Sequence, residues 1–288
     1  MAITRTGANI AGKSFTPEIW SKKLLWKFYA ASVCNEICNT EWQGEVQGQG
    51  DKVYIRKRPD VLVNPYTVNS VINWQDINDD KITLTIDYAF SAAAKIDTVD
   101  MNQMDINLQA EIIDEISNNL RIAIEDTVLG GAYASATTSL SSTAWQTSTN
   151  SITAITQAQA ALNALNVPVE NRWLLMHPSA AQYLLAQTAL YALNAGTNEG
   201  ALQRGYVGHL AGFQIYQSSR VPGAGTSGSP FKMMAGHISA ITLATQFTQF
   251  ETDVPLQDYF GKGIRALNCF GYKVAKPESL VYMPTTIS

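Results

Sequence analysis

Three acidic residues in the last fifth of the sequence have the type and spacing that acid–base chemistry requires. Glu251, Asp253 and Asp258 lie close together, next to aromatic side chains. Two carboxylates that share a pocket can donate and accept a proton. No candidate base or metal ligand accompanies them, so the sequence favours a solvated or intersubunit loop over a catalytic site.

Cysteine and histidine residues could hold a metal ion or act as nucleophiles. Cys34 and Cys38 are one helical turn apart, which suits a metal-binding pair, but small buried apolar residues fit this spacing better. His177, His209 and His237 are far apart and show no ligand spacing, so we interpret them as ordinary polar or capping side chains. The sequence therefore predicts no catalytic residue, no metal site and no cofactor.

The letters of a dinucleotide-binding motif, G-x-G-x-x-G, occur at Gly223, Gly225 and Gly228. That motif binds phosphate only when a helix begins at its last glycines, because the helix N-terminus then faces the pyrophosphate. Here Ser229, Pro230 and a strand-like run follow instead. A surface loop is therefore predicted over residues 223–230.

Four basic residues form the strongest candidate for a binding surface. They are Lys52, Arg56, Lys57 and Arg58, with Tyr54 among them. A basic patch with an aromatic side chain can bind nucleic acid. It can also pair with an acidic surface, on the same chain or on another copy. We prefer the second interpretation, because residues 61–130 carry 12 acidic and 3 basic residues.

A long helix is predicted to carry that acidic surface. Residues 100–129 repeat apolar side chains with the period of a helix, and Gly130 and Gly131 are expected to end it. The acidic residues expected on its solvent side are Asp105, Glu111, Asp114, Glu115, Glu125 and Asp126. The first four of these, Asp105, Glu111, Asp114 and Glu115, are the predicted intersubunit partners of the basic residues.

The basic residues lie at the start of a predicted arm. Residues 51–56 and 81–87 alternate apolar and polar side chains, as strands do. The long stretch between them has two prolines and no strong period. A loop of this length is uncommon inside a compact domain and usually carries function or reaches another molecule. Residues 51–87 are therefore predicted to leave the body as a hairpin-like arm, and the polar residues 1–15 as a second arm.

Composition and the order of the elements limit the class of protein. The chain has 288 residues, a net charge of −4 and only 15% charged residues, against about 25% in an average soluble chain. Low charge leaves neutral surface for burial against other subunits, and the acidic balance argues against a dedicated nucleic-acid binder. No apolar stretch approaches the roughly 20 residues of a membrane span. Strand and helix signals follow one another irregularly, which predicts an α+β fold.

Six short motifs, taken in order, make the sequence similar to a known family. They are Thr16–Trp20, Gly48–Ile55, Asn171–Pro178, Gly208–Tyr216, Ala235–Ile241 and Phe270–Val274. In this order and spacing they resemble the major capsid proteins of tailed bacteriophages, which have the Hong Kong 97-like fold. The resemblance runs from about residue 15 to residue 283.

The resemblance implies a division of the chain into five parts. Residues 1–45 would form the N-arm and first helix, 46–90 the extended loop, and 91–165 the peripheral domain with its spine helix at 100–129. Residues 166–260 would form the axial domain, and residues 261–288 would return to the peripheral domain.

The resemblance also implies a function. The chain would assemble with itself, as hexamers and pentamers, into an icosahedral shell that encloses phage double-stranded DNA. Assembly would occur in the host cytoplasm, without a membrane, and the protein would remain in the virion. Its other partners would be a portal at one vertex, a decoration protein in some shells, and the packaged DNA through weak non-specific contact. Because the sequence lacks a long charged helical N-terminal segment, a separate scaffolding protein is expected.

Two other functions remain open from the sequence. An encapsulin-type compartment shares the fold but holds enzymes instead of DNA, and nuclease-protected DNA inside the particles would exclude it. A soluble oligomeric enzyme that uses the carboxylates near Asp258 is the less favoured alternative. A stable small oligomer would support the enzyme, and a particle of megadaltons would exclude it.

Overall fold

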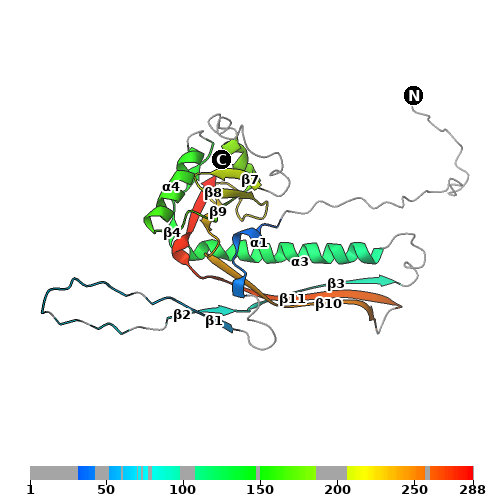
Figure 1. The fold of residues 1–288 in the computed structure, drawn as a ribbon. Coiled ribbons are helices and arrows are strands. Elements are labelled where there is room, and N and C mark those ends of the chain that lie inside the picture. The colour runs from blue at the N-terminus through cyan, green and yellow to red at the C-terminus, as the bar shows by residue number, and fades with distance from the viewer. Residues whose placement is uncertain are drawn as a thin grey trace, which may run out of the picture.

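The computed structural model describes residues 32–42, 52–59, 61–69, 71–72, 74–76, 80–97, 108–146, 150–185, 206–256 and 260–287. They build a rounded lobe, a long helix that lies on a long sheet, and an arm that leaves the body beside that sheet (Figure 1). The predictions for the helix beginning at Thr16, for residues 1–31 in general, and for residues 100–107 and 186–193 lie outside the described residues.

A seven-stranded sheet with parallel and antiparallel neighbours forms the centre of the lobe. Its order is β4-β12-β9-β6-β8-β7, and β5 also pairs with β12. The strands are β4 (Thr138–Ser139), β5 (Thr143–Ala144), β6 (Arg172–Met176), β7 (Tyr206–Leu210), β8 (Phe213–Gln217), β9 (Phe231–His237) and β12 (Leu280–Thr286). This mixed sheet, with helices between its strands, confirms the predicted α+β class.

The central strand β6 shows how the lobe is held together. All five of its residues are buried, as expected for a strand that is covered on both faces. The helices α4 (Asn150–Ala164) and α5 (Pro178–Leu185) contribute Ile155, Leu162 and Leu184 to the same apolar core. Burial of these side chains fixes the lobe as one packed unit.

A three-stranded antiparallel sheet extends from the lobe beneath the long helix (Figure 1). Its order is β10-β11-β3, with β10 (Ile241–Pro255), β11 (Gly261–Val274) and β3 (Tyr88–Asp97). The helix α3 (Leu108–Ala132) packs on one face of this sheet, where Ile116 and Leu120 share an apolar cluster with Ile96 and Ile264. Two short 3-10 helices, η2 (Tyr133–Ser135) and η4 (Pro277–Ser279), follow α3 and β11.

The end of α3 differs from the sequence prediction. The described part confirms a helix from residue 108 to 129, but the helix passes through Gly130 and Gly131 and ends at Ala132. A Cβ atom at Gly131 would overlap the hydroxyl group of Tyr272 on β11. Gly131 therefore allows close packing between helix and sheet, and the prediction that the two glycines end the helix is wrong.

Part of the long sheet was not predicted from the sequence. β3 contains the stretch Ser91 to Ala94, and alanine has a low preference for strands. Its ten residues pair with β11 from Gly261 to Phe270, so tertiary pairing outweighs the local preference. β10 was predicted over residues 238–244 and instead runs from Ile241 to Pro255.

The arm confirms the predicted hairpin at its base. β1 (Lys52–Arg56) pairs antiparallel with β2 (Lys81–Thr85), with Lys52 opposite Thr85. The described residues between these strands form no further helix or strand, and they extend away from the body (Figure 1). The side chain of Gln75 crosses the arm: its amide nitrogen donates to the carbonyl oxygen of Leu62 at 2.8 Å, and its oxygen accepts from the Leu62 N–H at 3.0 Å.

Residues 32–42 pack against the body through the apolar core. The short helix α1 (Cys34–Ile37) buries Ile37 and both Cys34 and Cys38, which are free thiols. This confirms the two cysteines as small buried side chains. Asn39 then forms a parallel bridge with Thr242 of β10. The chain is thereby fixed between the lobe and the long sheet.

Candidate intersubunit surfaces

The structure brings the four predicted basic residues together at the base of the arm. Lys52 and Arg56 lie on the exposed face of β1, because exposed and buried residues alternate along this strand. Lys57 and Arg58 follow directly and are also exposed. The pairing of β1 with β2 adds a fifth cation, because Lys81 lies opposite Arg56.

Tyr54 lies within this basic surface, as its position in the alternation requires. It is 56% exposed, and the Lys81 Nζ atom lies 4.3 Å from the centre of its ring. The opposite face of the hairpin is apolar: Val53 and Ile55 are buried in a cluster with Leu84. This buried face fixes the direction in which the cationic side chains point.

The predicted acidic surface lies on the first described turns of α3. Glu111 and Asp114 are exposed, and Glu115 is half-buried with its Oε1 accepting a hydrogen bond from Asn119 at 3.0 Å. Residues three and four apart are neighbours on a helix surface, so these carboxylates form one acidic patch. Asp105 lies outside the described residues.

The prediction that Glu125 faces solvent is wrong. Glu125 is only 1% exposed, because the C-terminal part of α3 is covered by the lobe and by residues 32–33. Its neighbour Asp126 is partly exposed and accepts a hydrogen bond from the Arg220 Nε atom at 2.6 Å. The acidic face of α3 is therefore limited to its N-terminal part.

The described parts of the basic and acidic surfaces do not meet within one chain. Among the described residues, no ion pair joins Lys52, Arg56, Lys57 or Arg58 to α3. The base of the arm and the N-terminal half of α3 also lie toward opposite ends of the body (Figure 1). Within the described residues, these two surfaces are therefore free of each other in a single subunit.

The described part of the arm beyond its base exposes many apolar side chains. Eight large apolar residues between positions 61 and 74 are 61–95% exposed, with Val63 at 95% and Trp74 at 92%. Exposed apolar patches on this scale mark interaction sites. The arm was predicted from the sequence, but this apolar surface was not. The available signal was Val61, Leu62, Val71 and Ile72 in a segment without helix or strand period.

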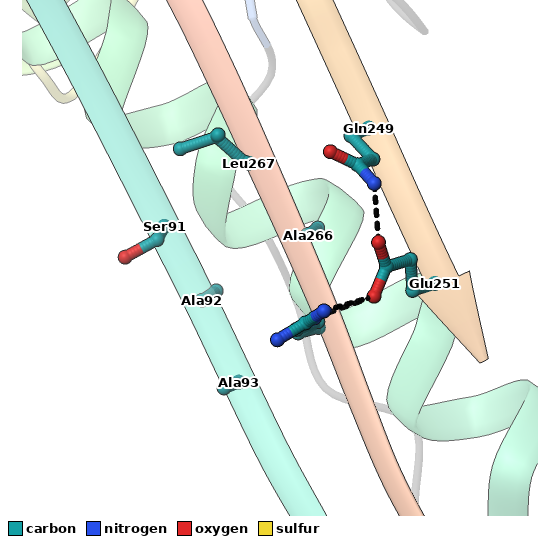
Figure 2. A pocket seen from close by; sticks show the side chains of 8 residues that line it. Ser91, Ala92, Ala93, Gln249, Glu251, Ala266 and Leu267 are labelled. Atoms are coloured by element: carbon teal, nitrogen blue, oxygen red, sulfur yellow. Dashed lines mark hydrogen bonds and ion pairs between the residues drawn. The ribbon is translucent and has the colours of Figure 1, made fainter. Parts of the chain in front are cut away.

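The sheet face opposite α3 carries a shallow groove. Ser91 and Ala93 of β3, Leu267 of β11 and Gln249 of β10 line it, and its volume is about 330 Å³ (Figure 2). Arg265 and Glu251 border it as a cross-strand ion pair, with the Arg265 Nε atom 2.6 Å from Glu251 Oε2. The groove is therefore lined by small, apolar and mutually neutralised side chains.

The carboxylates considered for acid–base chemistry do not form a proton-transfer pair in the described structure. Glu251 lies on the strand β10 and not in a loop, and it is held by Arg265 and Gln249 (Figure 2). Asp258 and the side chain of Asp253 lie outside the described residues. Both oxygens of the Glu251 carboxyl group are engaged by side chains of β10 and β11.

The histidines have local structural contacts. The His177 ring stacks on Phe231 at 4.1 Å between ring centres, and its Nδ1 accepts from the Ser179 N–H. His237 Nδ1 lies 2.8 Å from Ser239 Oγ. Burial lowers the pKa of both imidazoles. In the part of the chain that the structure describes, no three His, Cys, Asp or Glu side chains are placed to hold a metal ion.

The G-x-G-x-x-G segment is a loop that leads into the strand β9, as predicted. Gly223 and Gly225 have φ values of 118° and 73°, which favour glycine. The Gly225 carbonyl oxygen accepts a hydrogen bond from Ile287 N–H at 2.7 Å. The glycines thus shape a turn against the C-terminal residues.

Within the described residues, no helix is both long enough and apolar enough to cross a bilayer.

Comparisons with known proteins agree with this architecture. The chain is similar to a protein of Mycobacterium phage Che8, with 24% identity, a TM-score of 0.77, and coverage of 95% of this chain and 98% of that one. It is similar to a chain of the capsid of cyanophage P-SCSP1u, with 17% identity, a TM-score of 0.73, and coverage of 95% and 94%. It is also similar to a chain of the mature capsid of bacteriophage PhiM1, with 16% identity, a TM-score of 0.68, and coverage of 94% and 92%. No curated protein sequence matches significantly.

These likenesses establish the Hong Kong 97-like fold, and a family model establishes the family. The model described as phage capsid protein matches residues 89–283, which is more than half of the chain. The match confirms the resemblance drawn from the motifs and does not favour the encapsulin alternative. The chain belongs to the phage capsid protein family and is a major capsid protein, a self-assembling structural component of the virion.

Proposed function

We propose that this chain assembles as hexamers and pentamers into an icosahedral shell around phage double-stranded DNA, that it does so in the host cytoplasm, and that it has no enzymatic activity. The observation that carries this proposal is the arm, whose described residues expose eight large apolar side chains away from its own body. A subunit with such an arm requires a neighbour to cover it.

The chemistry of the arm supports a second copy of the chain as that neighbour. Full burial of one valine or leucine side chain contributes about 1.5–3 kcal/mol, part of which offsets the entropy lost on association. The arm and any surface that receives it are different parts of the chain, so the contact is heterologous. Heterologous contacts close into rings when the rotation between copies allows it. Rings of five and six subunits are the capsomers that we propose.

Charge complementarity sets the register of this contact in our proposal. Lys52, Arg56, Lys57 and Arg58 of one copy face the acidic residues Asp105, Glu111, Asp114 and Glu115 of the next. Exposed ion pairs each contribute only about 0.2–1 kcal/mol. Their role is therefore to orient the arm and exclude wrong registers, while apolar burial supplies most of the stability.

We further propose that the lobe is the axial domain and that the long sheet with α3 is the peripheral domain. The two are interleaved along the sequence. α4 and β12 lie in the lobe, whereas β10 belongs to the long sheet. β10 falls within residues 166–260, the proposed axial region, although it is part of the long sheet that we assign to the peripheral domain. Residues 1–45 and 46–90 provide the N-arm and the extended loop.

The remaining partners follow from the same proposal. They are a separate scaffolding protein, a portal at one vertex, a decoration protein in some shells, and packaged DNA through weak contact. A net charge of −4 suits a shell that must not bind its DNA tightly. Expression of the chain alone tests the scaffolding requirement, because uniform shells of correct size without any other phage protein would contradict it.

Substitutions in the arm test the proposed function. Val63→Asp together with Trp74→Asp should leave a folded subunit that no longer forms large particles, as judged by circular dichroism, sedimentation and negative-stain microscopy. Val169→Asp, at a position in the lobe that is 58% exposed, is the matched control and should assemble. Normal shells from the arm variant would overturn the proposal. Nuclease-protected DNA in wild-type particles from infected cells distinguishes the proposed shell from an enzyme-filled compartment.

A further inference from the structure

Glu125 is a buried carboxylate that lies apart from the proposed intersubunit surfaces. It belongs to α3 and is 1% exposed. Its Oε1 accepts a hydrogen bond from Ser218 Oγ at 2.7 Å, and its Oε2 accepts one from the Val33 N–H at 3.3 Å. One side chain therefore joins three segments: α3, the turn after β8, and the residues that lead into α1.

Among the described residues, no cation forms a direct ion pair with Glu125. Arg220 donates to Asp126, the next residue on α3, through both its Nε and Nη2 atoms. The thiols of Cys34 and Cys38 are buried on the α1 side, and hydrogen bonding to Cys38 together with burial raises the pKa of Cys34. Among the described residues, Glu125 therefore lies near Arg220, which is paired with Asp126, near the Asp126 carboxylate, and near the buried thiols of Cys34 and Cys38.

Burial is the main influence on the protonation of Glu125. It raises the pKa of this carboxyl group above the usual value. Hydrogen bonds from Ser218, Ser32 and Val33 lower the pKa in part, and the charge of Asp126 raises it further. When residues 32–33 separate from α3, water reaches the group and its pKa returns to the ordinary range.

We propose that Glu125 is a clasp that fastens residues 32–33 to α3 and to the turn after β8, and that uptake of one proton by its carboxyl group tightens this clasp. The protonated form keeps both contacts. Its O–H donates to Ser218 Oγ, and its other oxygen still accepts from the Val33 N–H. Beyond the clasp, Asn39 is held by backbone hydrogen bonds to Ile241 and Leu243 at 2.7 and 3.0 Å, so opening is confined to the residues before Asn39 that contact Glu125.

The sign of the pH effect follows from the two states. The closed clasp binds a proton more tightly than the open one, so its added stability is fully present below the ordinary glutamate pKa. That stability is lost as pH rises through the raised pKa of the closed state. The ratio of closed to open molecules changes up to about tenfold for each unit that separates the two pKa values. The clasp is therefore weakest at neutral and alkaline pH.

Hydrogen–deuterium exchange on the full chain, in its purified assembly state, tests this inference. Peptides covering residues 32–42 are compared at about pH 5 and about pH 7.5, either side of the expected transition, after correction for intrinsic exchange rates. Wild-type protein should show several-fold higher protection at the lower pH. Glu125→Gln should show high protection at both values, because the amide keeps the shape without the charge. Wild-type protection that does not change with pH would overturn the proposal.

Two further variants separate the clasp from general effects. Glu111→Gln makes the same chemical change at an exposed position of α3 and should retain the wild-type pH response. Ser218→Ala removes a hydrogen-bond partner from both forms of Glu125, but the bond to the ionised carboxylate is the stronger one, so the midpoint of protection against pH should move to higher pH. An unchanged midpoint in Ser218→Ala contradicts the proposal. This measurement tests the clasp even if the Glu125→Gln variant does not fold.

Discussion

The hydroxyl group of Tyr272 on β11 occupies the space that a side chain at Gly131 on α3 would need. The Tyr272 ring also stacks on Tyr88 of β3 at 5.7 Å between ring centres. Burial, with a hydrogen bond to Tyr88, raises the pKa of Tyr272 to about 12. One side chain thus connects helix, central strand and edge strand where the long sheet meets the lobe.

Substitution of Gly131 should reveal this contact. Gly131→Ala places a methyl group against the Tyr272 hydroxyl, and such overpacking costs about 1–3 kcal/mol of unfolding free energy. Thermal unfolding of the purified protein measures the loss. Gly130→Ala is the matched control, because no atom lies within 4 Å of its Cβ position. That control should gain about 0.5–1 kcal/mol from the preference of alanine for helices. Adding Tyr272→Phe to Gly131→Ala should restore part of the loss, and equal effects at both glycines would refute the contact.

Gly271 fixes the base of the arm to the long sheet. A Cβ atom there would overlap the carbonyl oxygen of Thr85 on β2, a backbone atom that cannot rotate away. Gly271→Ala should therefore displace β2, lower stability by about 1–3 kcal/mol, and increase protease cleavage within the arm. Gly228→Ala, where no atom lies within 4 Å, should leave the cleavage pattern unchanged. An intact arm in Gly271→Ala would contradict the prediction.

Charge reversal tests the proposed pairing of the arm with α3. Replacing Arg56, Lys57 and Arg58 by glutamate should weaken assembly, most strongly at low salt, because ionic screening already weakens the wild-type contact at high salt. Reversing Glu111, Asp114 and Glu115 to lysine in the same chain should partly restore particle yield in sedimentation. Normal assembly of the triple arm variant at both salt concentrations would contradict the proposed pairing.

Arg172 is a buried cation that is held by backbone carbonyl groups. Its Nε and Nη2 atoms donate to the carbonyl oxygens of Pro168 and Val167 at 2.7 and 2.5 Å, which closes the turn after α4. Arg172→Lys keeps the charge but loses this two-pronged geometry, and should cost about 1–3 kcal/mol. Chemical denaturation measures the loss. Arg121→Lys, at an exposed position of α3, should change stability little, and a similar cost at both positions would show that Arg172 has no special role.

Periodic segments were predictable from the sequence, because each depends on its own side chains. The apolar repeat of α3 predicts that Ile116 is buried, and the alternation in β1 predicts the same for Val53 and Ile55. These predictions do not depend on contacts with distant segments, and the structure confirms them. The basic surface followed from the same alternation. β3 was missed because its alanines express no strand preference, and it forms only through pairing with β11.

Features that depend on distant contacts could not be found in this way. Glu125 follows the same helical spacing as exposed acids, and only the approach of Val33 and Ser218, each more than 90 positions away, buries it. Gly131 resembles a helix terminator until Tyr272 is seen against it. The groove on the open sheet face combines β3, β10 and β11, so no single segment encodes it.

The two hydrogen bonds between Gln75 and Leu62 tie the outgoing and returning halves of the arm together across 13 positions of sequence. The Gln75 side-chain amide makes the pair of hydrogen bonds that a backbone peptide group would make in a β-sheet, at a place where the described residues form no strand pairing. This cross-link restricts the conformations that the arm can adopt in water, so less conformational entropy is lost when a neighbouring subunit covers the arm. Stiffness is thereby built into the appendage before it meets any neighbour.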